Sequence, residues 1–480
     1  MMVKLRNMAV ALLLTAVGAY GCSEEVPFTD NPSCKAEFST DTLSFDTVFT
    51  AIGSATDCFK IYNRHESGIR MDVSLVGGND SPFRINVDGQ SGIVISDVVI
   101  LPEDSAYCFV SVSIDPHDAD NPVLVMDSIR FARKDGSAQY VRLMAYGQDV
   151  IILRNEKIVS NTLLTSSRPY LIYDTLFVDK NAVLGIEAGT RMYFHDRAMV
   201  RVAGKILASG TCDNMIVMRG DRLDNLLQDV PYDLLAGRWG GILIDSCSFG
   251  NQFVGCDIHG GTWGIKTDTA SIVREKLLVN SSIIHNVSED CLQLNYCRSR
   301  IYNSQITNSG GHCVSLLGGD NSFQFCTIAD FYPWTEKLSA VDIRNKADSA
   351  VVPIVNAGFR NCIITGSAAD EVTGLVVDSI SGQRPEDVSN YSFSHSLIHT
   401  LDTLNRHFHD NVWDKEDNPV YGAGNFRHIS SGDYRYDFHL DSLSLARFNA
   451  VSSDAFRYDL DGVERPDSLA DAGCYQYVGK

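Results

Sequence analysis

Phe253-Val-Gly-Cys256-Asp-Ile258 is the first of six copies of a short motif that recurs down to Ile398. The other copies are Val279-Asn-Ser281-Ser-Ile283, Tyr302-Asn-Ser304-Gln-Ile306, Gln324-Phe-Cys326-Thr-Ile328, Arg360-Asn-Cys362-Ile-Ile364 and Ser394-His-Ser396-Leu-Ile398. The isoleucines are 25, 23, 22, 36 and 34 residues apart, and a Cys or Ser lies two places before each one. Self-similarity at such a period is typical of a solenoid, and short β-branched runs indicate strands rather than helices.

A second column follows the first five copies of the motif. It reads Gly264-Ile265, Cys291-Leu292, Cys313-Val314, Ala340-Val341 and Gly374-Leu375. Two columns per period predict a parallel β-helix, here over residues 155–400, whose Cys and Ser side chains point into the coil as small buried groups. The sequence therefore predicts an all-β fold.

Residues 38–148 show a different pattern, of alternating strand-like runs separated by turn residues. This pattern favours a β-sandwich. Cys58 and Cys108 each precede a Phe at the start of such a run, so a cross-strand disulfide between them is one possible pairing. The runs Phe59-Lys-Ile-Tyr-Asn63 and Ile114-Asp-Pro116, with the closing Ala145-Tyr-Gly147, resemble bacterial immunoglobulin-like domains of the ASPM/SPD-2/Hydin type. That resemblance implies a spacer or adhesion module.

The first residues read as a targeting segment. Lys4 and Arg6 precede an apolar stretch over 8–17 that is too short to span a bilayer, and Ala19-Tyr-Gly-Cys22 follows. The segment 1–21 resembles a bacterial lipoprotein signal peptide, which implies lipidation at Cys22 and a spacer over 22–37. The acidic Ser23-Glu-Glu25 resembles the surface-export signal of Bacteroidota lipoproteins. We therefore expect an outer-membrane lipoprotein exposed at the cell surface, with a periplasm-facing anchor as the alternative.

Charge and cysteine spacing exclude several function classes. The formal net charge of -20 offers no basic surface for nucleic acid or for an anionic membrane. The thirteen cysteines show no C-x-x-C spacing, so no structural metal site and no cofactor are predicted. Calcium bound by Asp257, Asp268, Asp290 and Asp320 is an alternative, although nothing in the sequence fixes their convergence.

The early turns of the solenoid carry a second resemblance. Gly189-Thr-Arg-Met-Tyr-Phe194, Gly204-Lys-Ile-Leu-Ala-Ser-Gly-Thr211 and Trp239-Gly-Gly-Ile242 are similar to Bacteroidota lipoproteins with right-handed parallel β-helix repeats. The resemblance implies a right-handed helix and carries no activity, because members of that group generally have none assigned. We interpret the irregular tail over 401–480 as a C-terminal cap.

An enzymatic interpretation rests on four short strings. Lys266-Thr-Asp268, Glu289-Asp290-Cys291, Gly311-His312-Cys313 and Arg344-Asn-Lys346 resemble the Asn-x-Asp, Asp-Asp, Gly-His-Gly and Arg-Ile-Lys motifs of polygalacturonase-like glycoside hydrolases. The resemblance implies that Asp268 and Asp290 lie about one strand spacing apart as acid and base, with His312 assisting and Arg344 or Lys346 gripping an anionic sugar. Lys266, Glu289, Cys313 and Asn345 depart from those motifs, and turn residues of any β-helix recur at this spacing.

A binding interpretation rests on the places where the period fails. Phe331-Tyr332-Pro-Trp334 interrupts the coils, and its aromatic side chains either stack on sugar rings or fold back over the coil edge. The insertion Asp221 to Leu235 is a candidate for the other wall of a groove. The sequence favours a non-catalytic envelope protein that binds glycan or a surface partner or has a structural role. A glycoside hydrolase or lyase acting on acidic polysaccharide is the alternative.

Overall fold

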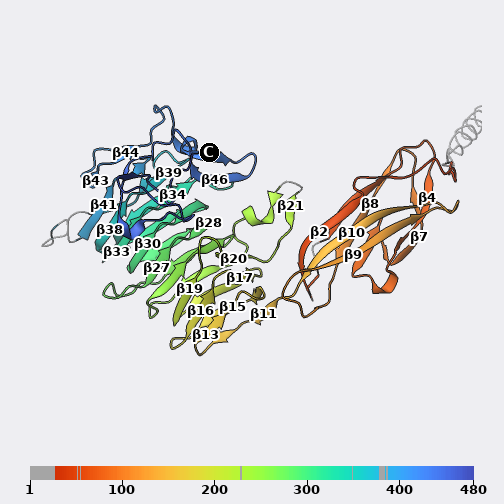
Figure 1. Cartoon of the computed structure of the whole chain (residues 1–480), viewed down its shortest axis with the longest axis horizontal. Helices are drawn as coiled ribbons and strands as arrows, with labels where there is room; N and C mark the ends of the chain where they lie inside the picture. The colour runs from red at the N-terminus through yellow and green to blue at the C-terminus, as the bar shows by residue number, and fades with distance from the viewer. Residues whose placement is uncertain are drawn as a thin grey trace, which may run out of the picture. The chain divides into compact units, whose positions relative to one another are not determined.

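The structure is a computed structural model that describes residues 27–50, 52–53, 56–227, 230–348, 350–377, 384 and 388–479. The predicted leader and Cys22 lie outside these residues. The chain divides into two compact units, Met1–Gln148 and Asp149–Lys480 (Figure 1). Within the described ranges, no helix combines the length and apolar character needed to cross a membrane.

The described part of the first unit is a β-sandwich of two five-stranded sheets. One sheet has the order β1 (Glu37–Phe38), β3 (Asp57–Tyr62), β8 (Ser105–Val112), β5 (Phe83–Val87) and β6 (Gln90–Gly92). The other has the order β2 (Thr42–Phe49), β10 (Ala138–Gln148), β9 (Val123–Ala132), β4 (Ile69–Leu75) and β7 (Val94–Ile100), and the 3-10 turn η1 (Gly78–Asp80) follows β4. Burial alternates along the strands, as in β8, because successive side chains point to opposite faces. The inward faces form one apolar core.

The register of β3 against β8 rules out the disulfide considered from the sequence. Cys58 lies opposite Phe109 and Cys108 lies opposite Phe59, so the two cysteines point to opposite faces of the sheet. Cys108 is buried in the core and both thiols are free. The pairing was wrong because a one-residue offset in register inverts the face of every side chain.

The second unit confirms the predicted parallel β-helix. Among its described residues, successive coils stack on one another, and their strands form three long parallel sheets that run along the stack (Figure 1). Sheet 1 contains β11 (Ile151–Arg154), β14 (Tyr170–Tyr173), β17 (Arg191–Phe194), β20 (Ile216–Gly220), β25 (Cys256–His259), β28 (Ile283–Val287), β31 (Gln305–Ser309), β34 (Thr327–Asp330), β39 (Ile363–Gly366), β42 (Leu397–Ile398) and β44 (Val412–Trp413). Sheet 2 contains β12 (Lys157–Ile158), β15 (Thr175–Val178), β18 (Met199–Val202), β23 (Gly241–Ile244), β26 (Ile265–Thr267), β29 (Leu292–Asn295), β32 (Val314–Leu317), β35 (Val341–Arg344) and β40 (Val372–Thr373). Sheet 3 contains β13 (Thr162–Leu164), β16 (Val183–Glu187), β19 (Lys205–Ser209), β24 (Asn251–Val254), β27 (Leu277–Asn280), β30 (Arg298–Tyr302), β33 (Gly319–Gln324), β38 (Ile354–Arg360), β41 (Ser389–Ser394) and β43 (Phe408–His409).

The six-copy motif forms the corner where each coil passes from sheet 3 to sheet 1. In the register of sheet 1, Ile258 pairs with Ile284, and Ile284 pairs with Ile306. The second copy is therefore Ser282 with Ile284, one residue later than the sequence alignment placed it. In the second column, Val341 pairs with Val372 and not with Leu375, which is exposed.

A residue with positive φ precedes the small residue of every copy. The six corner residues are Gly255, Ser281, Asn303, Phe325, Asn361 and His395, with φ between 48° and 58°. This left-handed conformation turns the chain sharply, and the next side chain then points inward. The inward hydroxyls satisfy backbone donors of the preceding coil: Ser282 Oγ accepts from the N–H of Cys256, and Ser304 Oγ from that of Ser282. The recurrence of Ser and Cys thus reflects a structural role.

Short elements outside the coils complete the unit. They are β21 (Asn225–Leu227), β22 (Val230–Pro231), η2 (Tyr232–Leu234), β36 (Lys346–Ala347), β37 (Ala350–Val351), η3 (Gly422–Asn425), β45 (Phe426–Ser430), β46 (Arg435–Leu440), β47 (Ala450–Val451), η4 (Asp454–Phe456) and β48 (Leu469–Ala470). Residues 414–479, called the cap below, pack an apolar cluster against the outer side of sheet 1, including Ala329 and Ile363. The cap therefore covers a lateral face of the coils.

Candidate functional site

A groove of about 360 Å³ lies over β28 and β31 on the outer side of sheet 1. Its residues come from η2, from the two strands and from the cap: Leu234, Ile283, His285, Asn286, Gln305, Thr307, Asn308, Tyr434, Tyr436, Asp437, Phe438, His439 and Tyr475. The inward direction of Ile284 and Ile306 forces their neighbours on the strand to point outward into the groove. The predicted second wall is present, because Leu234 belongs to the 221–235 insertion.

One end of the groove adjoins a cluster of two histidines and an aspartate. The register of β25 and β28 sets His259 beside His285, with ring centroids 4.6 Å apart. Asp257 Oδ1 lies 2.8 Å from His259 Nδ1 and 3.2 Å from His285 Nε2. His259 Nε2 contacts Asp233 Oδ1 at 2.6 Å, and Arg219 pairs with the same carboxylate at 3.0 Å. Three adjacent coils and the insertion thus supply one charged network.

The pKa values in this network follow from the opposed effects of burial and charge. Burial opposes ionisation of Asp257, but the imidazoles of His259 and His285 outweigh it and lower the pKa of this carboxyl. Burial also disfavours a charged His259, yet Asp257 and Asp233 raise its pKa to about 9. Burial also opposes ionisation of Asp233, but His259 and Arg219 outweigh it and lower the pKa of this carboxyl. Without a bound ion, His259 is an imidazolium held between two carboxylates.

A second histidine cluster belongs to the cap. His439 Nδ1 lies 2.5 Å from Asp437 Oδ1, and its Nε2 lies 2.7 Å from Asp461 Oδ2. The imidazole also packs on the ring of Tyr475 at 4.1 Å. The hydrogen bond to Asp461 raises the pKa of His439, with burial acting in the opposite direction. The groove is therefore bordered by two imidazoles that contact carboxylates.

Aromatic side chains form the cap wall of the groove. Tyr434 stacks on Trp334 with ring centroids 5.7 Å apart, and 42% of Trp334 is exposed. The hydroxyl of Tyr436 is buried, and among the described residues it has no hydrogen-bond partner. Burial raises the pKa of Tyr436 to about 12, so this hydroxyl stays protonated as a donor. Aromatic faces with an unpaired hydroxyl make this wall suited to a polar ligand.

The predicted aromatic loop contributes less than the sequence suggested. Phe331 packs against Phe438 of the cap, and Tyr332 is buried, with its hydroxyl accepting the N–H of Ala236. These two side chains cover the coil edge, which is the second of the two alternatives that the sequence left open for this loop. Trp334 remains exposed beside the groove wall.

The predicted carboxylate pair is not formed. Ile265 pairs with Leu292, so Asp290 aligns with Trp263 and Asp268 aligns with Asn295. The two aspartates lie at opposite ends of the strands of sheet 2, about five residues or roughly 16 Å apart along the strand direction. The expected separation of one strand spacing was wrong because register, and not the repeat length, decides which residues are neighbours.

Two of the other predicted catalytic residues, Asp290 and His312, do meet, but at a turn. Asp290 Oδ1 accepts the N–H of His312 at 2.8 Å, and His312 Nδ1 lies 2.8 Å from the carbonyl oxygen of Ser339. Arg344 does not join them: it lies at the other end of β35, opposite Leu317, and pairs with Asp342 at 2.7 Å. Burial raises the pKa of Asp342, with Arg344 and His312 acting to lower it. Each of these side chains is held by a contact within the protein, which is the arrangement expected of residues with a structural role.

The four aspartates of the calcium alternative do not converge. Asp257 lies on sheet 1. Asp268 and Asp290 lie at opposite ends of two neighbouring strands of sheet 2, β26 and β29. Asp320 lies on sheet 3, where it pairs with Arg298 at 2.7 Å. In the described part of the chain, one group of His, Cys, Asp or Glu brings ligand atoms close enough for a metal, namely Asp257, His259 and His285. The sequence signal for it was the repeated Ile-His after the motif, at Ile258-His259 and Ile284-His285.

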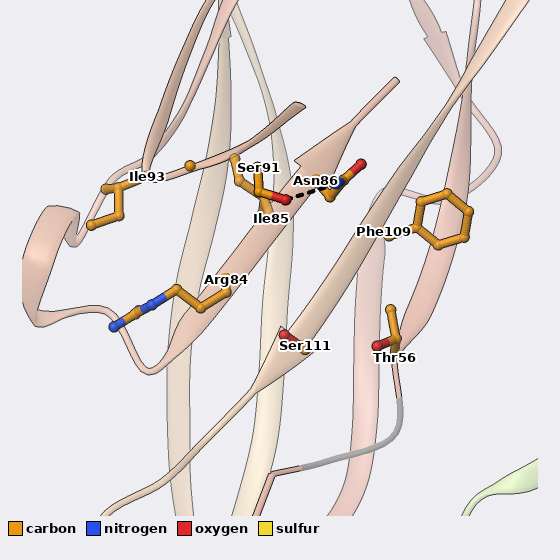
Figure 2. A pocket seen from close by; sticks show the side chains of 9 residues that line it. Thr56, Arg84, Ile85, Asn86, Ser91, Ile93, Phe109 and Ser111 are labelled. Carbon is orange, nitrogen blue, oxygen red and sulfur yellow. Dashed lines mark hydrogen bonds between the residues drawn. The ribbon is translucent and has the colours of Figure 1, made fainter. Parts of the chain in front are cut away.

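A larger hollow, of about 700 Å³, lies on the sandwich and is drawn in Figure 2. Arg84 extends to one side of it and Phe109 to the other, while Asn86 donates a hydrogen bond to Ser91. Arg84 is the one ionisable group among its nine lining residues, and its guanidinium already donates to the carbonyl oxygen of Ser81 at 2.6 Å. This hollow lacks the clustered groups found at the groove.

Comparisons with known proteins give distant likenesses. No protein-family model and no curated protein matches the chain. A Clostridium perfringens family 123 glycoside hydrolase of glycolipid glycans is 7% identical with a TM-score of 0.18, and covers 25% of this chain and 30% of its own. The catalytic unit of a Streptomyces thermodiastaticus GH87 α-1,3-glucanase is 10% identical with a TM-score of 0.19, over 74% of this chain and 75% of its own. A Yersinia enterocolitica family 28 exopolygalacturonase is 9% identical with a TM-score of 0.17, over 77% and 89%. The matched proteins include glycan-acting enzymes, and the fold assignment itself stands on the sheet topology.

Proposed function

We propose that the groove on sheet 1 binds a carbohydrate chain and that the protein is a glycan-binding component of the cell envelope. The observation that carries the proposal is the wall of Tyr434 and Tyr436, in which the buried Tyr436 hydroxyl lacks a partner among the described residues. A buried hydroxyl without a partner calls for an explanation, and a hydroxyl of a bound sugar would satisfy it. Aromatic faces with a few convergent polar groups are typical of small-molecule sites.

The charge of the groove supports a neutral glycan over an acidic one. Neither Lys nor Arg is among its thirteen lining residues, and Asp437 contributes a carboxylate. The amides of Asn286 and Asn308 offer both donors and acceptors, which suit sugar hydroxyls. A polyanionic chain would meet this carboxylate and a net charge of -20, with no Lys or Arg among the lining residues to compensate.

A glycan array probed with the mature chain tests the proposal, followed by calorimetry with the best neutral oligosaccharide. Tyr436→Ala and Tyr434→Ala should weaken binding about tenfold or more, since each removes an aromatic contact from the wall. Tyr140→Ala is the matched control, because Tyr140 is 55% exposed on the sandwich. Unchanged affinity in both groove variants, or wild-type binding to acidic glycans alone, would contradict the proposal.

The envelope location is proposed from the leader, whose Cys22 lies outside the described residues. Lipidation at Cys22 would anchor the protein to the outer membrane, and the acidic residues after it support export to the cell surface. Metabolic labelling with a fatty acid should label the wild type and not Cys22→Ala. Protease added to intact cells should degrade a surface-exposed protein, whereas survival of the full-length chain would favour the periplasmic face.

A hydrolase or lyase is the second candidate, and a specific observation favours it. His285 and His439 both line the groove and each contacts an aspartate, which is the arrangement of a general acid or base. These groups differ from the motif residues Asp268, Asp290, His312 and Arg344. Polysaccharide cleavage by the purified protein would support this candidate if His439→Gln abolishes it. Cleavage that is lost on Asp268→Ala and Asp290→Ala would instead support the sequence motif.

A further inference from the structure

The ligand atoms of Asp257, His259 and His285 are arranged as a metal site would need them. All three atoms lie within 4.8 Å of one another. The two imidazole nitrogens, His259 Nδ1 and His285 Nε2, converge on one oxygen of Asp257 at 2.8 and 3.2 Å. Ligand atoms about 2.1 Å from a tetrahedral Zn²⁺ are about 3.4 Å apart, so the two oxygen–nitrogen distances would have to lengthen by only a few tenths of an ångström to admit the ion.

We infer that Asp257, His259 and His285 bind a divalent first-row transition metal, with Zn²⁺ the best match to their donors. Two imidazoles and one carboxylate are the ligands that zinc accepts in sites that keep an open position. Calcium and magnesium favour all-oxygen shells, which this cluster does not offer. The inference is independent of carbohydrate binding, because it rests on three side chains of which the groove shares one.

The surroundings supply the outer support that metal-bound histidines have. His259 Nε2 contacts Asp233 Oδ1 at 2.6 Å, which would fix the tautomer and leave Nδ1 free as the ligand. Arg219 in turn holds Asp233 at 3.0 Å. The backbone also constrains the rings, since His259 and His285 are register partners on adjacent parallel strands. Asp233 is therefore a positioning residue for the site.

The site opens toward the groove through one ligand. His285 is a groove residue, whereas His259 is buried. A metal held there would have its remaining positions on the groove side, where they are available to water or to a ligand hydroxyl.

Zinc uptake by the mature chain tests the inference. The measurement uses a Cys212→Ser, Cys247→Ser background, because both thiols are exposed and could bind zinc themselves. After dialysis against micromolar Zn²⁺, elemental analysis should find about one ion per chain. His285→Ala and Asp257→Asn should each lose that ion, and Asp233→Ala should weaken binding by about 10- to 100-fold. Cobalt substitution should give d–d absorption without a thiolate charge-transfer band.

His195→Ala is the matched control, because His195 is a histidine of the same unit that contacts one aspartate, Asp221, at 2.7 Å. The His195→Ala variant should bind as much zinc per chain as the wild type. Circular dichroism should show that the His285 variant is folded, and Asp257→Asn provides a second variant if it is not. A folded wild type that takes up no zinc, or uptake that persists in both variants, would overturn the inference and identify the cluster as a charge network alone.

Discussion

Tyr475 donates a 2.9 Å hydrogen bond from its phenolic oxygen to Oε1 of Gln305, a residue 170 positions earlier in the chain. Gln305 begins β31, and its amide donates to Thr307 Oγ1 at 3.0 Å. Both Tyr475 and Gln305 line the groove. The end of the cap is therefore fastened to the floor of the groove by a buried polar contact, and the shape of the groove depends on this attachment.

We predict that Tyr475→Phe destabilises the β-helix unit by about 1–3 kcal/mol, because it leaves the buried Gln305 Oε1 without its donor. The four tryptophans, Trp239, Trp263, Trp334 and Trp413, all lie in this unit, so urea unfolding followed by their fluorescence reports on it alone. Tyr477→Phe is the control, since it keeps the ring that packs under Arg447 at 4.0 Å. Equal stabilities of the two variants would contradict the prediction.

A second prediction concerns the stacked phenylalanines inside the coils. Phe359 lies between Phe323 and Phe393, with centroid distances of 4.5 and 4.7 Å, and all three are fully buried. Phe359→Ala should cost about 3–5 kcal/mol, because the rigid neighbouring coils cannot close the cavity. The same fluorescence-detected unfolding measures the loss. Phe109→Ala, on the sandwich surface, should leave this transition unchanged.

Sequence reasoning predicted the fold because the coils repeat locally. The inward isoleucines and the Cys and Ser before them depend only on neighbouring coils, so their pattern appears in the sequence at a nearly fixed period. The alignment slipped by one residue at Ser281, where Ser281 and Ser282 are the same residue type. Their φ values and not their identities distinguish the corner residue from the inward one.

The site was harder to predict because it depends on register and on contacts distant in sequence. Asp268 and Asp290 are one repeat length apart in the sequence but lie at opposite ends of neighbouring strands, so the repeat length suggested a pair that does not exist. The cap wall joins Tyr436 to β28 and β31, more than a hundred residues away, and no local pattern indicates such a contact. The insertion was correctly expected at the groove, because a long break in a solenoid period must leave the coil.

Glu371 provides a third prediction, on pH. Burial raises the pKa of Glu371 to about 8 and that of Asp330 to about 7. Because both are raised, the folded state keeps protons that the unfolded state releases near pH 4. The stability that these groups contribute is therefore full below that pH and is lost as the pH rises through 7 and 8. Unfolding free energy of the β-helix unit should fall by on the order of a few kcal/mol between pH 5 and 8.

Glu371→Gln and Asp330→Asn should each flatten this slope. The two carboxyl oxygens of Glu371 accept the backbone N–H groups of Ala340 and Ala368, both at 2.7 Å, whereas an amide has one oxygen and can accept only one of them in this geometry. The variant will therefore lose some stability at pH 5, and the readout is the slope with pH rather than the absolute value. A slope unchanged in both variants would assign the pH dependence to other groups.

His439 provides a fourth prediction, with the same sign and a different location. Its pKa is raised, chiefly by the hydrogen bond to Asp461, so the imidazolium stabilises the cap fully below pH 6.5 and less as the pH rises through the folded value. The His439→Gln variant should be less stable than the wild type by about 1 kcal/mol at pH 5.5, since 31% of the side chain is exposed and solvent screens the pairs. The deficit should shrink at higher pH, which the fluorescence-detected unfolding resolves.

His428→Gln removes a histidine 3.8 Å from one exposed aspartate and should show no such trend. A deficit that stays constant from pH 5.5 to 9 would mean that His439 contributes packing on Tyr475 rather than charge.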